Sequence, residues 1–150
     1  MSAATQALLC VGLYSQKAAS GAELGPHYGE LMMSLLIVDD DARMRSLIRS
    51  IVSDLVGPIT ECGDGIAAEE TCQQHRPDWV LMDLTMPRMN GLDATRRILV
   101  SNPAARVVIV TANDGQRLRD AATTAGAFAF VSKENLFDLR QIIQPESLSV

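Results

Sequence analysis

The sequence predicts an α/β fold, and three observations lead to it. From residue 34 onward, five short apolar runs alternate with five segments whose apolar residues recur at helical spacing. The run Trp79–Met82 is wholly apolar and stops abruptly at Asp83, where turn residues follow. The run Ile59–Cys62 is more polar than the others, which is typical of a strand at the edge of a sheet.

The five apolar runs are predicted to be parallel strands. Strands joined through helices by right-handed crossovers leave few arrangements. With the polar second strand at an edge, the favoured order is 2-1-3-4-5 in a doubly wound, flavodoxin-like sheet with helices on both faces. The predicted strands are Leu35–Val38, Ile59–Cys62, Trp79–Met82, Arg106–Val110 and Phe128–Val131.

The predicted helices lie between and after these strands, and turn or capping residues limit several of them. Asp64 is the expected N-cap of the second helix, and Gly126 is the expected stop of the fourth. Proline residues follow the first, third and fifth helices, where the chain cannot continue as a helix. The predicted helices cover about 44–55, 64–74, 92–99, 115–125 and 136–143.

Composition excludes several classes of function. The 150 residues carry a net charge of -5 without a basic run, so we expect no direct binding to nucleic acid. The apolar runs are too short to cross a membrane. Three widely spaced cysteines fit neither a disulfide framework nor a zinc site, which favours a cytoplasmic location.

Composition also divides the chain into three parts. Residues 1–33 hold only three charged side chains and are predicted to be a flexible N-terminal extension, or the product of a start codon assigned too far upstream. Residues 34–144 form the predicted domain. Residues 145–150 are a short C-terminal tail after the last helix.

Polar residues follow four of the predicted strands. Asp39 and Asp40 follow the first strand, Asp83 the third, Thr111 the fourth and Lys133 the fifth. In the order 2-1-3-4-5 these strands are neighbours, and ligands bind at the carboxyl ends of such strands. We therefore expect the five side chains to converge in one pocket.

The chemistry of this pocket favours a phosphoryl group and a metal ion. Three close carboxylates repel one another unless a cation lies among them, and Mg²⁺ prefers carboxylate oxygens and water. Lys133 and the Thr111 hydroxyl suit phosphoryl oxygens, and an aspartate carboxylate can act as the nucleophile.

Four stretches together resemble the receiver domain of two-component response regulators, and chemotaxis regulators in particular. They are LLIVDDD (35–41), WVLMDLTMPRMNGL (79–92), VVIVTAN (107–113) and FAFVSK (128–133). The resemblance covers residue 34 to about residue 144. Each stretch alone is weakly specific, but their order and spacing together are highly specific.

The resemblance implies a role for each residue of the pocket. Asp83 would be the phosphoacceptor, taking a phosphoryl group from a histidine kinase or a histidine phosphotransfer protein. Asp40 would bind Mg²⁺ directly, Asp39 mostly through water, and Thr85 through its backbone carbonyl. Lys133 would pair with the phosphoryl group.

Further residues would pass the signal on. Thr111 would move toward the phosphoryl group and Phe130 would swing inward, which couples the site to the face of the fourth helix, fifth strand and fifth helix. This face would bind an effector protein or a second copy of the chain. Thr85 and Asn113 lie where the family tunes the lifetime of the acyl phosphate.

Three departures from the family pattern stand out. Glu134 follows Lys133 where many members have proline after a cis peptide, so this peptide is either trans or held in a strained cis form. Phe130 replaces the commoner tyrosine and lacks its hydroxyl. Asp41 is an additional acid, and we expect it to cap the following helix. Arg117 and Arg119 are expected to be solvated, or to contribute to a partner surface on the fourth helix.

The leading hypothesis is a stand-alone receiver domain, a phosphoacceptor switch rather than an enzyme, although able to catalyse its own phosphorylation and dephosphorylation. A second hypothesis is a Mg²⁺-dependent phosphohydrolase with an aspartyl nucleophile, but such enzymes are expected to carry a DxD motif after the first strand. A third is a receiver scaffold that no longer signals by phosphate, and a fourth is a fragment of a longer regulator.

Overall fold

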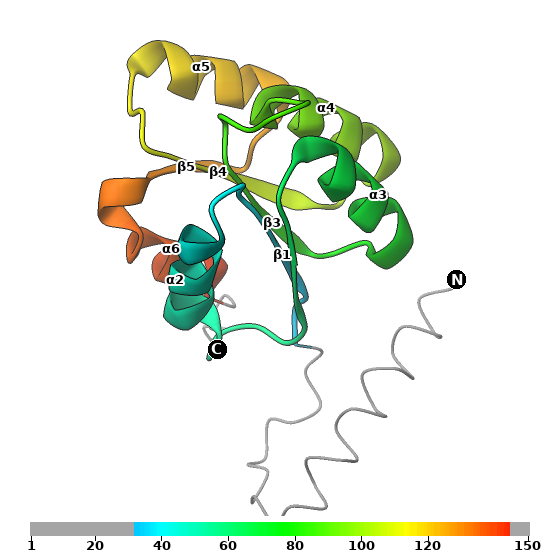
Figure 1. The fold of residues 1–150 in the computed structure, drawn as a ribbon, viewed down its shortest axis with the longest axis vertical. Coiled ribbons are helices and arrows are strands. Elements are labelled where there is room, and N and C mark those ends of the chain that lie inside the picture. The colour runs from blue at the N-terminus through cyan, green and yellow to red at the C-terminus, as the bar shows by residue number, and fades with distance from the viewer. Residues whose placement is uncertain (1–31, 145–150) are drawn as a thin grey trace, which may run out of the picture. The chain divides into compact units, whose positions relative to one another are not determined.

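The computed structural model describes residues 32–144 (Figure 1). The predicted tail 145–150 and nearly all of the predicted extension 1–33 lie outside these residues. Met33 packs against the core, and its carbonyl accepts a hydrogen bond from the Gly57 amide at 2.8 Å. No helix among residues 32–144 is long and apolar enough to span a membrane.

A five-stranded parallel sheet forms the centre of the domain, in the order β2-β1-β3-β4-β5 (Figure 1). This confirms the predicted fold class and strand order. β2 lies at one edge of the sheet, and all four of its residues are at least partly exposed, whereas β1 and β3 are buried throughout. The strands are β1 Leu35–Val38, β2 Ile59–Cys62, β3 Trp79–Met82, β4 Arg106–Thr111 and β5 Ala129–Ser132.

Helices cover both faces of the sheet, and the described ones are numbered from α2 (Figure 1). Side chains of successive strand residues point to opposite faces. Leu35 and Ile37 therefore pack with α2 and α6, whereas Leu36 and Val38 pack with α3, α4 and α5. The helices are α2 Ala42–Val52, α3 Gly65–His75, α4 Gly91–Ser101, α5 Gln116–Ala125 and α6 Asp138–Ile143, with a 3₁₀ turn, η1, over Lys133–Asn135.

Side chains that cap the helices fix where several of them begin. The Asp64 carboxylate accepts a hydrogen bond from the Ala67 amide at 2.9 Å, as predicted for an N-cap. Asp41 caps α2 by accepting from the Arg43 amide, which confirms its assignment as a cap. Asn90 caps α4 in the same way, so this helix begins at Gly91 rather than Leu92.

The segment after β5 differs most from the prediction. The predicted helix over residues 136–143 is preceded by η1, and α6 itself begins only at Asp138. Ser132 begins η1 by accepting a hydrogen bond from the Glu134 amide. The strand before it also lies one residue later than predicted. No cis peptide occurs among residues 32–144, so the bond between Lys133 and Glu134 is trans.

Candidate functional site

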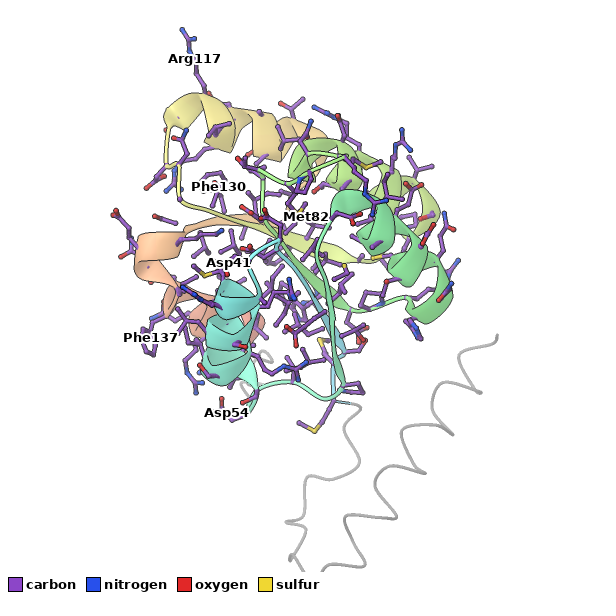
Figure 2. The ribbon with its side chains drawn as sticks, in the orientation of Figure 1. Asp41, Asp54, Met82, Arg117, Phe130 and Phe137 are labelled. Carbon is purple, nitrogen blue, oxygen red and sulfur yellow. The ribbon has the colours of Figure 1, made fainter. Side chains whose placement is uncertain are left out.

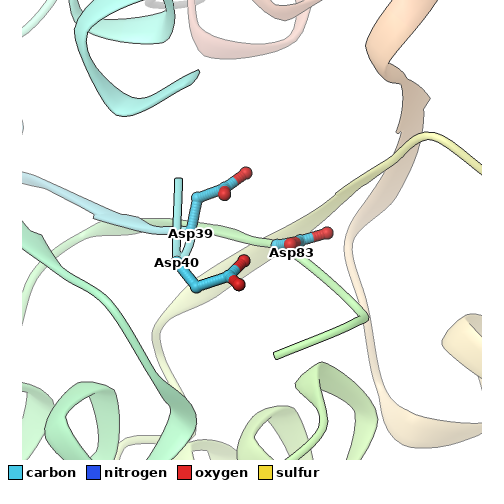
Figure 3. A group of neighbouring side chains, drawn as sticks. All are labelled: Asp39, Asp40 and Asp83. Carbon is cyan, nitrogen blue, oxygen red and sulfur yellow. The ribbon is translucent and has the colours of Figure 1, made fainter. Parts of the chain in front are cut away.

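Three carboxylates meet at the carboxyl edge of the sheet (Figure 3). Asp39 and Asp40 directly follow β1, and Asp83 directly follows the neighbouring strand β3. One oxygen from each side chain lies within 4.8 Å of one from each of the others. Asp39 and Asp83 are buried, whereas Asp40 is exposed. The cluster is therefore built on buried backbone but opens toward solvent on one side.

Lys133 supplies the positive charge of the site. It follows β5, and its Nζ lies 2.8 Å from Asp39 Oδ2 and 3.4 Å from Asp83 Oδ1. The hydrogen bond from the Glu134 amide to the Ser132 hydroxyl, at 3.3 Å, holds the turn that carries Lys133. Ser132 was not among the predicted site residues, because its role appears only when the 3₁₀ turn forms.

The surroundings oppose ionisation of Asp83. Burial and then the Asp39 carboxylate raise the pKa of Asp83, and the nearby Lys133 ammonium offsets only part of this rise. Burial alone would lower the pKa of Lys133, but its contacts with the two carboxylates outweigh burial and raise it. Lys133 therefore stays protonated and positively charged at neutral pH. Its single charge does not balance three carboxylates, so a second cation would neutralise the remaining negative charge.

The donor set fits a hard divalent cation. Asp39 Oδ2 is buried and receives no hydrogen bond of good geometry, although the Lys133 ammonium lies close to it. This oxygen therefore keeps unused acceptor capacity beside two other carboxylates. Mg²⁺ binds to one or two carboxylates while keeping several waters, which suits a cluster with an exposed side.

The loop after Asp83 packs directly against the backbone of that residue. A Cβ on Gly91 would lie 2.0 Å from the Asp83 carbonyl oxygen, so only glycine fits at this position. The Gly91 amide also donates to the Leu84 carbonyl at 2.9 Å. The Asn-Gly pair predicted a turn here, but sequence alone did not show that Gly91 supports the acid. Thr85 is exposed in this loop, and its carbonyl as a metal ligand stays a prediction.

Thr111 and Phe130 lie on the same face of the sheet. Thr111 ends β4 two residues after Ile109, which is paired with Phe130 across the strands and belongs to the core under α3, α4 and α5. Thr111 is buried, and its hydroxyl accepts a hydrogen bond from the Asn113 amide at 3.3 Å. Asn113 itself is exposed.

The sequence predicted that Arg119 in α5 is solvated, but its side chain contacts two other residues of the domain. Its guanidinium lies 4.6 Å from the centre of the half-buried Phe130 ring, and its Nε donates to Asp114 at 2.7 Å. Arg117, by contrast, points away from the domain (Figure 2). An arginine over an aromatic face is a cation–π contact, so α5 covers the Phe130 side chain from outside.

Residues 35–144 match the family described as the response regulator receiver domain. The chain belongs to this family. The prediction of a two-component receiver domain from four sequence stretches is therefore confirmed.

Known relatives agree with this assignment. The chain is 37% identical over 103 residues to the chemotaxis protein CheY of Listeria monocytogenes, which is 68% of this chain and 87% of the relative. A two-component response regulator of the LuxR family from Aurantimonas superposes with a TM-score of 0.69 at 32% identity, over 73% of this chain and 81% of that one. The receiver domain of an Arabidopsis thaliana histidine kinase, solved in complex with Mg²⁺, superposes with a TM-score of 0.66 at 25% identity, over 74% and 89%.

Proposed function

We propose that this receiver domain is a phosphoacceptor switch in which Asp83 takes a phosphoryl group from the phosphohistidine of a sensor kinase or histidine phosphotransfer protein. One observation carries the proposal. The buried Asp83 carboxylate has the Lys133 ammonium 3.4 Å away and lies within 4.8 Å of the carboxylates of Asp39 and Asp40, close enough to share a metal ion.

The residues present can perform the transfer. A carboxylate oxygen of Asp83 forms the new bond to phosphorus, and the phosphorus–nitrogen bond of the donor histidine breaks, returning the electron pair to the imidazole. Lys133 balances charge on the transferred oxygens, and the Thr111 hydroxyl donates a hydrogen bond to one of them. Asp39, Asp40, Asp83 and the Thr85 carbonyl would hold Mg²⁺, which supplies further neutralisation of those oxygens when bound.

The output surface would be the face of α5, β5 and α6. Movement of Thr111 toward the phosphoryl group would vacate space beside Phe130, and the ring would turn inward on the same face of the sheet. Phosphorylation would thereby shift an existing equilibrium between two conformations of this face. An effector protein in the cytoplasm, or a second copy of the chain, would bind one conformation in preference to the other.

Intact-mass measurement after incubation with Mg²⁺ and acetyl phosphate tests the proposal. The wild type is expected to gain one phosphoryl group, and Asp83→Asn none. Asp41→Asn is the matched control, because it makes the same change at the acid directly after the cluster residues Asp39 and Asp40, while asparagine keeps the helix cap. An adduct on Asp83→Asn equal to that on the wild type would refute Asp83 as the acceptor.

A further inference from the structure

Arg45, near the start of α2, reaches the backbone of the acidic turn. Its Nη1 donates to the Asp39 carbonyl oxygen at 2.6 Å, and its Nε donates to Glu61 Oε1 at 3.3 Å. Its side chain is only 21% exposed, and Nη1 would lie 3.8 Å from a Cβ placed on Gly63. The guanidinium therefore ties the turn after β1 to the edge strand β2 and the loop that follows it.

The Asp39 carbonyl belongs to the peptide that joins Asp39 to Asp40. Because a peptide unit is planar, a hydrogen bond to its oxygen fixes the direction in which the chain enters Asp40. Among the described residues, no side chain or amide holds the Asp40 carboxylate itself. The placement of this exposed carboxylate beside Asp83 therefore depends on the backbone that Arg45 contacts.

Arg49 offers a natural comparison one helical turn further on. It binds the same acid, with Nε and Nη2 donating to Glu61 Oε2 at 2.9 and 2.6 Å. Its other acceptor is the Ile59 carbonyl at 3.5 Å, so it does not contact the acidic turn. The two arginines share a helix and a partner, and they differ in the contact with Asp39.

We propose that Arg45 is a positioning residue for the divalent-cation site, which holds the Asp39–Asp40 peptide so that both carboxylates face Asp83. This inference rests on the proposed function. Three clustered carboxylates repel one another, and without a restraint the exposed Asp40 would turn toward solvent. A hydrogen bond from a charged donor is a strong restraint, and groups that orient metal ligands typically change metal affinity by about tenfold or more.

Titration of the full chain with MgCl₂, followed by the amide NMR shifts of Asp39, Asp40 and Asp83, tests the proposal. Arg45→Met is expected to raise the dissociation constant for Mg²⁺ by about tenfold. Arg49→Met, which loses the same salt-bridge partner, is expected to leave it within about twofold, because exposed ion pairs contribute little on their own. Thermal unfolding in EDTA measures the stability of each variant without the ion, which separates a loss of Mg²⁺ affinity from a loss of folded protein.

Two results would overturn the inference: an unchanged dissociation constant in Arg45→Met, or an equal increase in both variants, which would assign the effect to Glu61 and β2. If Arg45→Met did not fold, Arg45→Lys against Arg49→Lys would decide, because lysine lacks the planar fork that reaches Asp39 and Glu61 together. Absence of Mg²⁺ binding by the wild type would instead overturn the proposed function, and this inference with it.

Discussion

At the scale of single residues, the fold holds the Asp83 carboxylate in surroundings that oppose its ionisation. Asp83 is buried at the end of β3, where burial and the Asp39 carboxylate both raise its pKa. Lys133 relieves only part of this, since it is shared with Asp39 at 2.8 Å. A carboxylate that is costly to ionise in the free protein gains most from a bound cation.

Replacing Asp83 with asparagine should stabilise the protein in the absence of Mg²⁺. A folded-state pKa above the ordinary value of 3.8 means that Asp83 favours folding when protonated and loses this contribution as pH rises through its folded pKa. In EDTA, Asp83→Asn should therefore unfold several degrees above the wild type at pH 7, with little difference near pH 4. Thermal unfolding followed by circular dichroism measures this, and an Asp83→Asn midpoint below that of the wild type at pH 7 would contradict it.

The sequence could predict which acids converge but not every group that holds them. Asp39, Asp83 and Lys133 were predictable because parallel strands end at one edge, and any residue directly after a strand lies there. The contact from Arg45 to the Asp39 carbonyl could not be predicted, since it depends on how α2 is placed against β2. The fit of Gly91 against the Asp83 carbonyl likewise depends on the path of the loop between them.

At the scale of elements, side-chain caps define helix ends more closely than apolar periodicity does. Asp64 was predictable as a cap because it is an acid that directly precedes the helical segment beginning at Gly65. The 3₁₀ turn η1 was not predictable, because Leu136 is apolar and buried and its spacing also fits a continuous helix from residue 136. The Ser132 hydroxyl instead accepts from the Glu134 amide and tightens the chain, so α6 begins only after Phe137.

Removing the Asp64 cap should destabilise α3 and break the ion pair with Arg88 in the loop after β3. Asp64 accepts from the Ala67 amide and from Arg88, and these contacts lower its pKa. Asp64→Ala should cost about 1 kcal/mol at pH 7, and Asp64→Ser, which keeps a cap, clearly less. Urea unfolding measures both.

The pH dependence provides the check on this cap. Because the pKa of Asp64 is lowered in the folded state, its contribution is present above the ordinary value of 3.8 and is lost as pH falls through the folded value. The difference between the wild type and Asp64→Ala should therefore persist from pH 7 down to about 5 and shrink as pH falls through and below 3.8. A difference that stayed constant below pH 3.8 would mean that the charge of Asp64 does not contribute.

At the scale of the whole molecule, the acidic cluster and Trp79 lie at opposite ends of the strands of the sheet. Asp83 follows the last residue of β3, and Trp79 is its first residue, roughly 13 Å away at about 3.3 Å per residue. Trp79 is the only tryptophan of the chain, and its ring packs against Arg106 and Phe128, far from the carboxylates. Its fluorescence should therefore report unfolding of the domain rather than events in the site.

Mg²⁺ should consequently stabilise the domain without changing the fluorescence of its native state. A ligand that binds only the folded form adds about 1.4 kcal/mol at a free concentration ten times its dissociation constant. The urea midpoint followed by Trp79 should rise with MgCl₂, and Asp39→Asn, which removes one ligand, should abolish most of the rise. NaCl at equal ionic strength is the control, because screening of the repelling carboxylates would act without specific binding. An equal rise of the urea midpoint in NaCl would assign the effect to screening. A rise seen only with Mg²⁺, and only when Asp39 is intact, would show that ion binding at the acidic cluster is coupled to folding.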